Sequence, residues 1–82
     1  MRKIRFKFIG KKLACCLDIE TACDYIAKEM KESFGSREIL DEKLEEIYCW
    51  GLNASLGDSI PVTDGVTLIT YIPEPKTAGK KE

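Results

Sequence analysis

The four cysteines, Cys15, Cys16, Cys23 and Cys49, carry the most reactive side chains of this sequence. Four thiolates bind zinc when they converge, usually from paired C-x2-C segments. Cys15 and Cys16 are adjacent, and adjacent residues of a strand point to opposite faces, so shared chelation is awkward. Disulfides would suit a secreted protein, but no segment resembles a secretory signal, which favours reduced thiols. We therefore expect no metal site and interpret the cysteines as small buried hydrophobic residues.

Other catalytic arrangements find little support in the sequence. Histidine is absent, which excludes Ser-His and Cys-His dyads. No pair of carboxylates can be assigned to a cleft. The glycine-containing stretch 51–59, GLNASLGDS, lacks the lysine and the spacing of a phosphate-binding loop. We expect a protein that is not an enzyme and that needs no cofactor.

The charge is unevenly distributed along the 82 residues, although the net charge is only −1. Residues 1–12 carry six Lys and Arg and no acid, whereas residues 13–50 carry ten acids against four bases. This predicts a cationic patch opposed to an acidic helical half, and it argues against a nucleic-acid-binding protein. The longest apolar run, residues 13–17, is too short for a membrane span, so we expect a cytoplasmic protein.

The N-terminal segment predicts a hairpin. In residues 1–9, Lys3, Arg5 and Lys7 alternate with apolar residues, which indicates a half-buried strand. Gly10 and Lys11 suit a turn, and residues 13–17 suit a second short strand. The three cations should project from the exposed face of the sheet. They could form a docking site for an acidic partner, or only an ordinary solvated face.

The middle of the chain predicts one main helix, over about residues 18–34, followed by an undecided segment. Thr21 and Asp24 resemble a capping box, and Gly35 is a suitable stop. The apolar residues at helical spacing are Ile19, Ala22, Cys23, Ile26, Ala27, Met30 and Phe34. Residues 36–47 can form a second, shorter helix or a helical turn within a loop.

The last part predicts an edge strand, a loop and a central strand. Residues 48–53 have strand character, with Trp50 as either an interface anchor or a satellite of the core. Residues 54–65 are loop-like, and residues 66–72 are apolar on both sides, as in a central strand. We expect one domain over 1–73 and a flexible tail over 74–82.

Taken in order, these elements predict an α+β fold of the ubiquitin-like β-grasp type. It would have a mixed sheet of about four strands and one main helix across one face. The last strand would return to the middle of the sheet and pair parallel to the first. The right-handed crossover rule would then determine which face the helix covers.

Residues 51–75, GLNASLGDSIPVTDGVTLITYIPEP, resemble the C-terminal half of the ThiS and MoaD sulfur-carrier proteins. In that family a strand ends in Val-Asn, a loop runs from proline to Asp-Gly, and a last strand leads to Pro-Pro and a Gly-Gly end. Here Leu52-Asn53, Pro61 to Gly65 and Ile72-Pro73 occupy the corresponding positions. The resemblance is to short motifs, and ubiquitin relatives share the expected fold.

The resemblance implies a protein cosubstrate for molybdopterin or thiamine biosynthesis. In the family, an E1-like adenylating protein activates the C-terminal glycine, which becomes a thiocarboxylate and passes sulfur to a synthase subunit. This sequence has no Gly-Gly in its tail, and Gly79 is followed by Lys80-Lys81-Glu82. A carrier would therefore need trimming to expose Gly79. The alternative is a non-conjugating protein–protein interaction module that uses Lys3, Arg5, Lys7 or Trp50.

Overall fold

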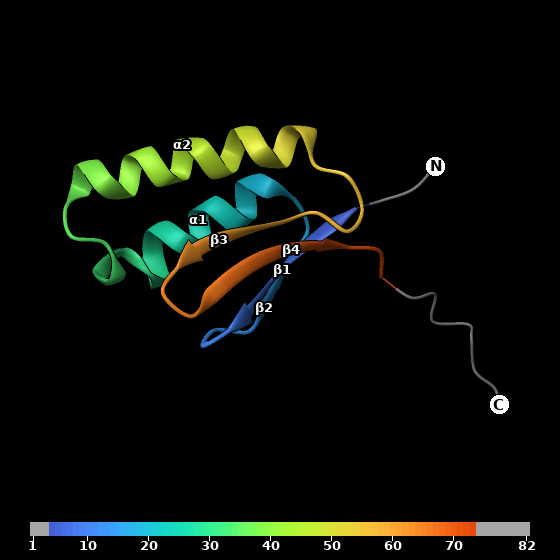
Figure 1. The fold of residues 1–82 in the computed structure, drawn as a ribbon, viewed down its shortest axis with the longest axis horizontal. Helices are drawn as coiled ribbons and strands as arrows, with labels where there is room; N and C mark the ends of the chain where they lie inside the picture. Colours follow the sequence, from blue (N-terminus) through green and yellow to red (C-terminus); the bar gives the residue numbers. More distant parts are fainter. Residues whose placement is uncertain (1–3, 74–82) are drawn as a thin grey trace, which may run out of the picture.

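A computed structural model describes residues 4–73, and these form a two-layer α+β domain (Figure 1). The chain begins with a hairpin, continues through two helices and ends with a second hairpin. Its elements are β1 (Arg5–Gly10), β2 (Ala14–Cys16), α1 (Ile19–Glu29), the short 3-10 helix η1 (Lys31–Ser33), α2 (Arg37–Asn53), β3 (Ser59–Thr63) and β4 (Val66–Tyr71).

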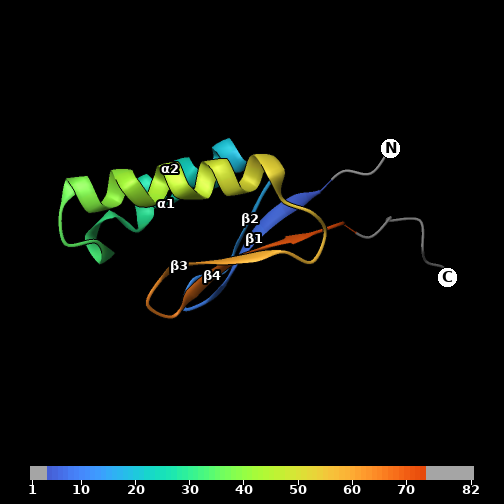
Figure 2. The ribbon, with the colours of Figure 1, turned by 45° about the horizontal axis from the view of Figure 1, so that its top comes forward.

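The four strands form one sheet in the order β2-β1-β4-β3, and every neighbouring pair is antiparallel. Both helices lie on the same side of this sheet (Figure 2). Helix α1 contacts the β1–β2 hairpin, whereas α2 packs against α1 and β3. The other side of the sheet has no covering element among residues 4–73. The α+β class and the central position of the last strand are confirmed.

The expected parallel pairing of the last strand with the first is wrong. Strand β4 pairs with β1 along its whole length in the antiparallel sense, from Arg5 opposite Tyr71 to Gly10 opposite Val66. The reason is the number of chain reversals. A full second helix adds one reversal between the two hairpins, so the final strand runs opposite to the direction expected with a single helix. The sheet therefore lacks the parallel central pair of the β-grasp architecture.

Helix α1 begins one turn earlier than the expected capping box. Asp18, in extended conformation, is the N-cap, and its carboxylate accepts a hydrogen bond of 2.8 Å from the backbone N–H of Thr21. This bond holds the pKa of Asp18 below its usual value. Thr21 thus lies inside the helix. The helix ends at Glu29, not near Phe34, because the backbone of Met30 leaves helical geometry and the chain tightens into η1.

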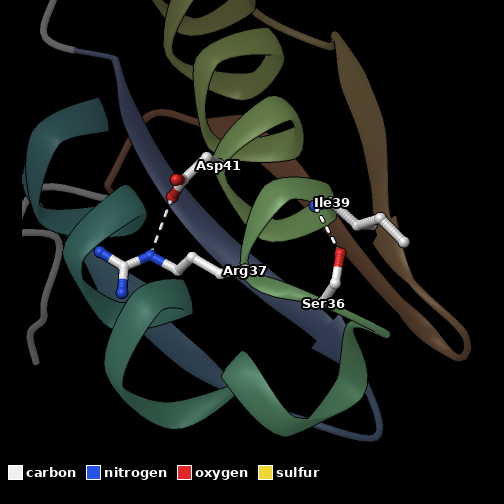
Figure 3. A network of polar contacts seen from close by, with 4 residues as sticks. All are labelled: Ser36, Arg37, Ile39 and Asp41. Atoms are coloured by element: carbon white, nitrogen blue, oxygen red, sulfur yellow. Dashed lines mark hydrogen bonds and ion pairs between the residues drawn. The ribbon is translucent and has the colours of Figure 1, made fainter.

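Helix α2 covers residues 37–47, which were expected to be a helix or a helical turn, and also residues 48–53, which were expected to be a strand. Ser36 is the N-cap and accepts from the backbone N–H of Ile39 at 3.2 Å, while Arg37 and Asp41 pair one turn apart at 3.3 Å (Figure 3). The helix runs on to Asn53, so the strand expected over 48–53 is wrong. The apolar spacing of Leu40, Leu44 and Ile47 continues through Trp50, which keeps one helical stripe on the core.

Gly51 permits the close approach of the two helices. A Cβ atom at this position would lie 2.2 Å from Cγ1 of Ile19, the first residue of α1. A larger residue would push the helices apart where they meet. The close contact with Ile19 therefore explains why glycine occurs near the end of α2 despite its low helix propensity.

Strand β3 lies within the segment expected to be a loop. Its burial alternates, with Ile60 and Val62 inward and Ser59 and Pro61 outward. Proline is tolerated because β3 is an edge strand, where no neighbour needs its missing N–H. The ladder shifts register between Pro61 and Thr63, and Asp64-Gly65 forms the turn into β4.

The core lies between the sheet and the helices and takes side chains from every main element. Phe8 is 1% exposed and stacks on Tyr25 of α1 at 5.0 Å between ring centroids. The buried apolar residues are Phe6, Phe8, Cys16, Ile19, Ala22, Ile26, Met30, Leu40, Ile47, Ile60, Val62, Val66 and Leu68.

One polar side chain, Thr70 of β4, is buried on the same face and fixes the loop between α2 and β3. Its Oγ1 accepts from the backbone N–H groups of Gly57 and Asp58, at 2.9 and 3.1 Å. It donates to the carbonyl of Ser55 at 2.8 Å. Every hydrogen-bonding group of the hydroxyl is thus used, which explains its burial.

Candidate interaction surface

The sheet face opposite the helices is the candidate functional site. Cross-strand partners lie on the same side of a sheet, so the ladder assigns each residue to a face. Two rows cross its centre, Cys15–Lys7–Ile69–Ser59 and Arg5–Tyr71. We call this side the open face. Its residues are Arg5, Lys7 and Ile9 of β1, Cys15 of β2, Ser59 and Pro61 of β3, and Thr67, Ile69 and Tyr71 of β4.

The open face is cationic and partly apolar. None of the four strands contains Asp or Glu, and within residues 4–73 neither Arg5 nor Lys7 pairs with a carboxylate. The acidic residues instead lie on the helices and loops. Helix α2 alone has five acidic and two basic residues. The two layers of the domain therefore have charges of opposite sign.

Lys7 and Tyr71 form the organised centre of the open face. The Nζ of Lys7 lies 4.9 Å from the centroid of the Tyr71 ring, a cation–π contact. The Cys15 side chain raises the pKa of Tyr71, and burial adds to this, while the positive charge of Arg5 acts in the opposite direction. The Tyr71 ring of β4 thus lies against the Lys7 side chain of β1.

A shallow hollow of about 480 Å³ extends the open face toward the β1–β2 turn. Apolar groups form most of its wall, with Lys7 at its side. The residues that line it are Lys7, Phe8, Ile9, Leu13, Ala14 and Cys15. The hollow could receive an apolar side chain of a ligand that lies along the strands.

The structure brings together only some of the residues singled out in the sequence. Arg5 and Lys7 share the open face, as expected. Lys3 and Gly79 lie outside the described residues. Trp50 belongs to α2 and is half-buried on the opposite side of the sheet, where its ring meets Phe6 edge-to-face at 5.8 Å. Trp50 is therefore a satellite of the core and does not join the cations.

Sequence reasoning missed the contribution of Ile69 and Tyr71 to this surface. Both belong to the strand whose two sides are apolar, which suggested burial on both faces. The useful signal was its alternation: Leu68 and Thr70 face the helices, so Ile69 and Tyr71 must face away.

The four thiols are free, and they differ in environment. Cys16 is buried, and burial raises its pKa. Cys23 is half-buried, its Sγ donates to the carbonyl of Leu44 at 3.7 Å, and burial raises its pKa to about 11. Cys15 and Cys49 are exposed, so the interpretation of all four as buried residues is wrong for these two. The described residues contain no cluster of three or more His, Cys, Asp or Glu that could hold a metal ion.

A second hollow of about 280 Å³ lies between the two β-turns and η1. Lys11 and Asp64 stand at its rim, and Nζ of Lys11 is 3.9 Å from the carboxylate. Both side chains are highly exposed, so this ion pair contributes little to the stability of the fold.

No helix in residues 4–73 is long and apolar enough to cross a membrane. No protein-family model, curated protein or solved structure matches this chain.

Proposed function

We propose that this domain is a protein-interaction module that binds an acidic, partly apolar segment of another protein through the open face. The observation that supports it is the grouping of Arg5, Lys7, Ile69 and Tyr71 on a face whose strands contain no acid. A partner that placed carboxylates near the two cations would meet no repulsion there. The same partner would be repelled by the acidic helical layer, which makes the docking orientation unique.

The spacing of the surface groups favours an extended ligand. Arg5 and Lys7 are two residues apart on one strand, so their side chains repeat about every 6.6 Å. An extended peptide repeats its side chains at the same interval. Acidic residues at alternate positions would then face both cations, and an apolar residue would fit against Ile69 or the hollow beside Leu13.

Two peptides of identical length test this proposal. One alternates Glu with Leu and Phe, and the other has Lys in place of Glu. Titration of the 15N-labelled protein should show amide shifts at Arg5, Lys7 and Ile69 with the acidic peptide only, and these shifts should weaken as salt rises. Shifts confined to the helices, or equal binding of the two peptides, would overturn the proposal.

Charge reversal provides the matched variants. Arg5→Glu with Lys7→Glu replaces two exposed attractive pairs by repulsive ones, each worth about 0.2–1 kcal/mol, so binding should weaken about tenfold. The control is Lys28→Glu with Arg37→Glu, which makes the same change of net charge on the helices. If a short single-stranded oligonucleotide bound more tightly than the acidic peptide, the partner class would be wrong.

The sulfur-carrier role remains a separate prediction, based on the resemblance of residues 51–75. Asn53 ends helix α2 and not a strand, whereas Asp64-Gly65 does form the turn before the last strand. The residue that would carry the thiocarboxylate, Gly79, lies outside the described residues. The intact mass of the protein from its native cell tests this role: a chain ending at Gly79 with sulfur in place of one carboxyl oxygen would establish it, and an unmodified chain ending at Glu82 would contradict it.

A further inference from the structure

The two edges of the sheet differ in their protection against further pairing. Edge strand β3 contains Pro61 and a register shift, two features that prevent another strand from adding to an edge. Edge strand β2 has neither. From Leu13 to Leu17 the sequence LACCL contains no proline, glycine or charge. The β2 edge is therefore the one that can accept another strand.

Three side chains along this edge are exposed and alternate with two that face the helices. Ala14 and Cys16 pair with Phe8 and Phe6 on the helix-covered side. Cys15 is exposed on the open face, and Leu13 and Leu17, two residues away on either side, are 79% and 63% exposed. Leu13 also lines the hollow beside Cys15. Two leucines with such exposure at an unprotected edge have no partner among residues 4–73.

We propose that a second copy of this chain occupies the β2 edge, with the two β2 strands antiparallel and Cys15 at the twofold axis. The segment from Leu13 to Leu17 is self-complementary about Cys15. An antiparallel copy centred there places Leu13 opposite Leu17 of the second copy, Ala14 opposite Cys16, and Cys15 opposite Cys15. The result is a continuous eight-stranded sheet with both helical layers on one side and one joined open face on the other.

The charged residues that flank residues 13–17 are also complementary in this register. Continuing the pairing outward brings Lys12 of one copy toward Asp18 of the other, at both ends of the row. The two Lys7 side chains would not repel each other strongly, because they would lie three strand spacings apart, about 14 Å. That distance exceeds the Debye length of about 8 Å at physiological salt. An isologous contact of this kind is the commonest way for identical chains to pair.

The length of β2 predicts a weak dimer. Stable interfaces bury about 1,200–2,000 Å² in total, and a three-residue strand with two leucines supplies less. We expect a dissociation constant on the order of 100 µM, so association should be visible only at high protein concentration.

Sedimentation equilibrium of the full chain under reducing conditions, from about 10 µM to 1 mM, measures this association. Leu13→Lys with Leu17→Lys places lysines opposite each other and should abolish the dimer. Leu13→Glu with Leu17→Lys has the same number of changes but places opposite charges together, and it should restore association. Leu56→Lys is the control, because Leu56 is 46% exposed in the loop before β3, the strand at the opposite edge of the sheet.

The exposed thiols give an independent measurement of register. Directly opposite residues of antiparallel strands have Cα atoms about 4.5–5.5 Å apart, within the range of a disulfide. With the oxidant diamide, the two Cys15 thiols would lose two protons and two electrons, form one S–S bond and reduce diamide to its hydrazine. The Cys49→Ser variant should give a covalent dimer and Cys15→Ser should not. Monomers at all concentrations, no rescue by the Glu–Lys variant, or cross-linking through Cys49 would each overturn the proposal.

Discussion

The two faces of strand β1 differ sharply in burial and in charge. Phe6 and Phe8 enter the core, while Arg5 and Lys7, their immediate neighbours, stand on the open face. Burial of an aromatic side chain contributes to stability in proportion to the apolar area removed from water. Exposed cations on the other face contribute little to stability, and they are the groups that the proposed acidic partner would meet. Residues that stabilise the fold and residues of the proposed binding face thus alternate along a single strand.

The largest expected effect comes from a substitution on the helix-covered side of the sheet. Phe8→Ala removes a ring that is 1% exposed and stacked on Tyr25, and it should lower the free energy of unfolding by about 3–5 kcal/mol. Lys7→Ala, on the adjacent position of the open face, should change it by less than about 0.5 kcal/mol. Urea unfolding followed by circular dichroism measures both. A comparable loss in the two variants would mean that the faces are not separable.

A smaller effect distinguishes two threonines of β4 that lie on opposite faces. Thr70→Val keeps the side-chain volume but leaves the N–H group of Gly57 without its acceptor, so it should cost about 1–3 kcal/mol. The N–H of Asp58 keeps a second acceptor, the carbonyl of Ser55 at 3.0 Å. Thr67→Val, on the open face, should be nearly neutral. Denaturant unfolding compares the totals, and hydrogen exchange at Gly57 should accelerate only in the Thr70 variant. Unchanged exchange there would contradict the role of Thr70.

The smallest expected effect is on the pKa of Tyr71, which lies on the open face. The Cys15 side chain raises the pKa of Tyr71, so Cys15→Ala should lower it. Arg5 stabilises the phenolate, so Arg5→Ala should raise it further. NMR titration of 13Cζ-labelled tyrosine resolves this ring from the other two tyrosines. Shifts in the same direction for both variants would show that the ring does not lie between these two side chains.

The sequence predicted the first half of the domain better than the second. The alternation of apolar and charged residues in β1 is local, and it requires only that one face meet the core. The same holds for the stripe of α1 and for the orientation of Arg5 and Lys7. The cap was misplaced because both Asp18 and Thr21 suit an N-cap, and only the observed hydrogen bond to the Thr21 N–H distinguishes them.

The second half could not be read correctly from local preferences. Residues 48–50 are Tyr, Cys and Trp, which favour strands in isolation, yet they continue the stripe of α2. Pro61 suggested a loop, because the tolerance of proline depends on which strand lies at the edge. Those two errors together changed the number of chain reversals, and with it the direction of the last strand.

The α+β class, the faces of β1 and the separation of basic and acidic segments could be predicted from the sequence, because each depends on residue type and on a spacing of a few residues. Three features could be seen only in the folded domain: β4 runs antiparallel to β1, the Tyr71 ring lies against Lys7, and β2 is the unprotected edge. These features depend on contacts between segments far apart in the chain, and no local pattern specifies them.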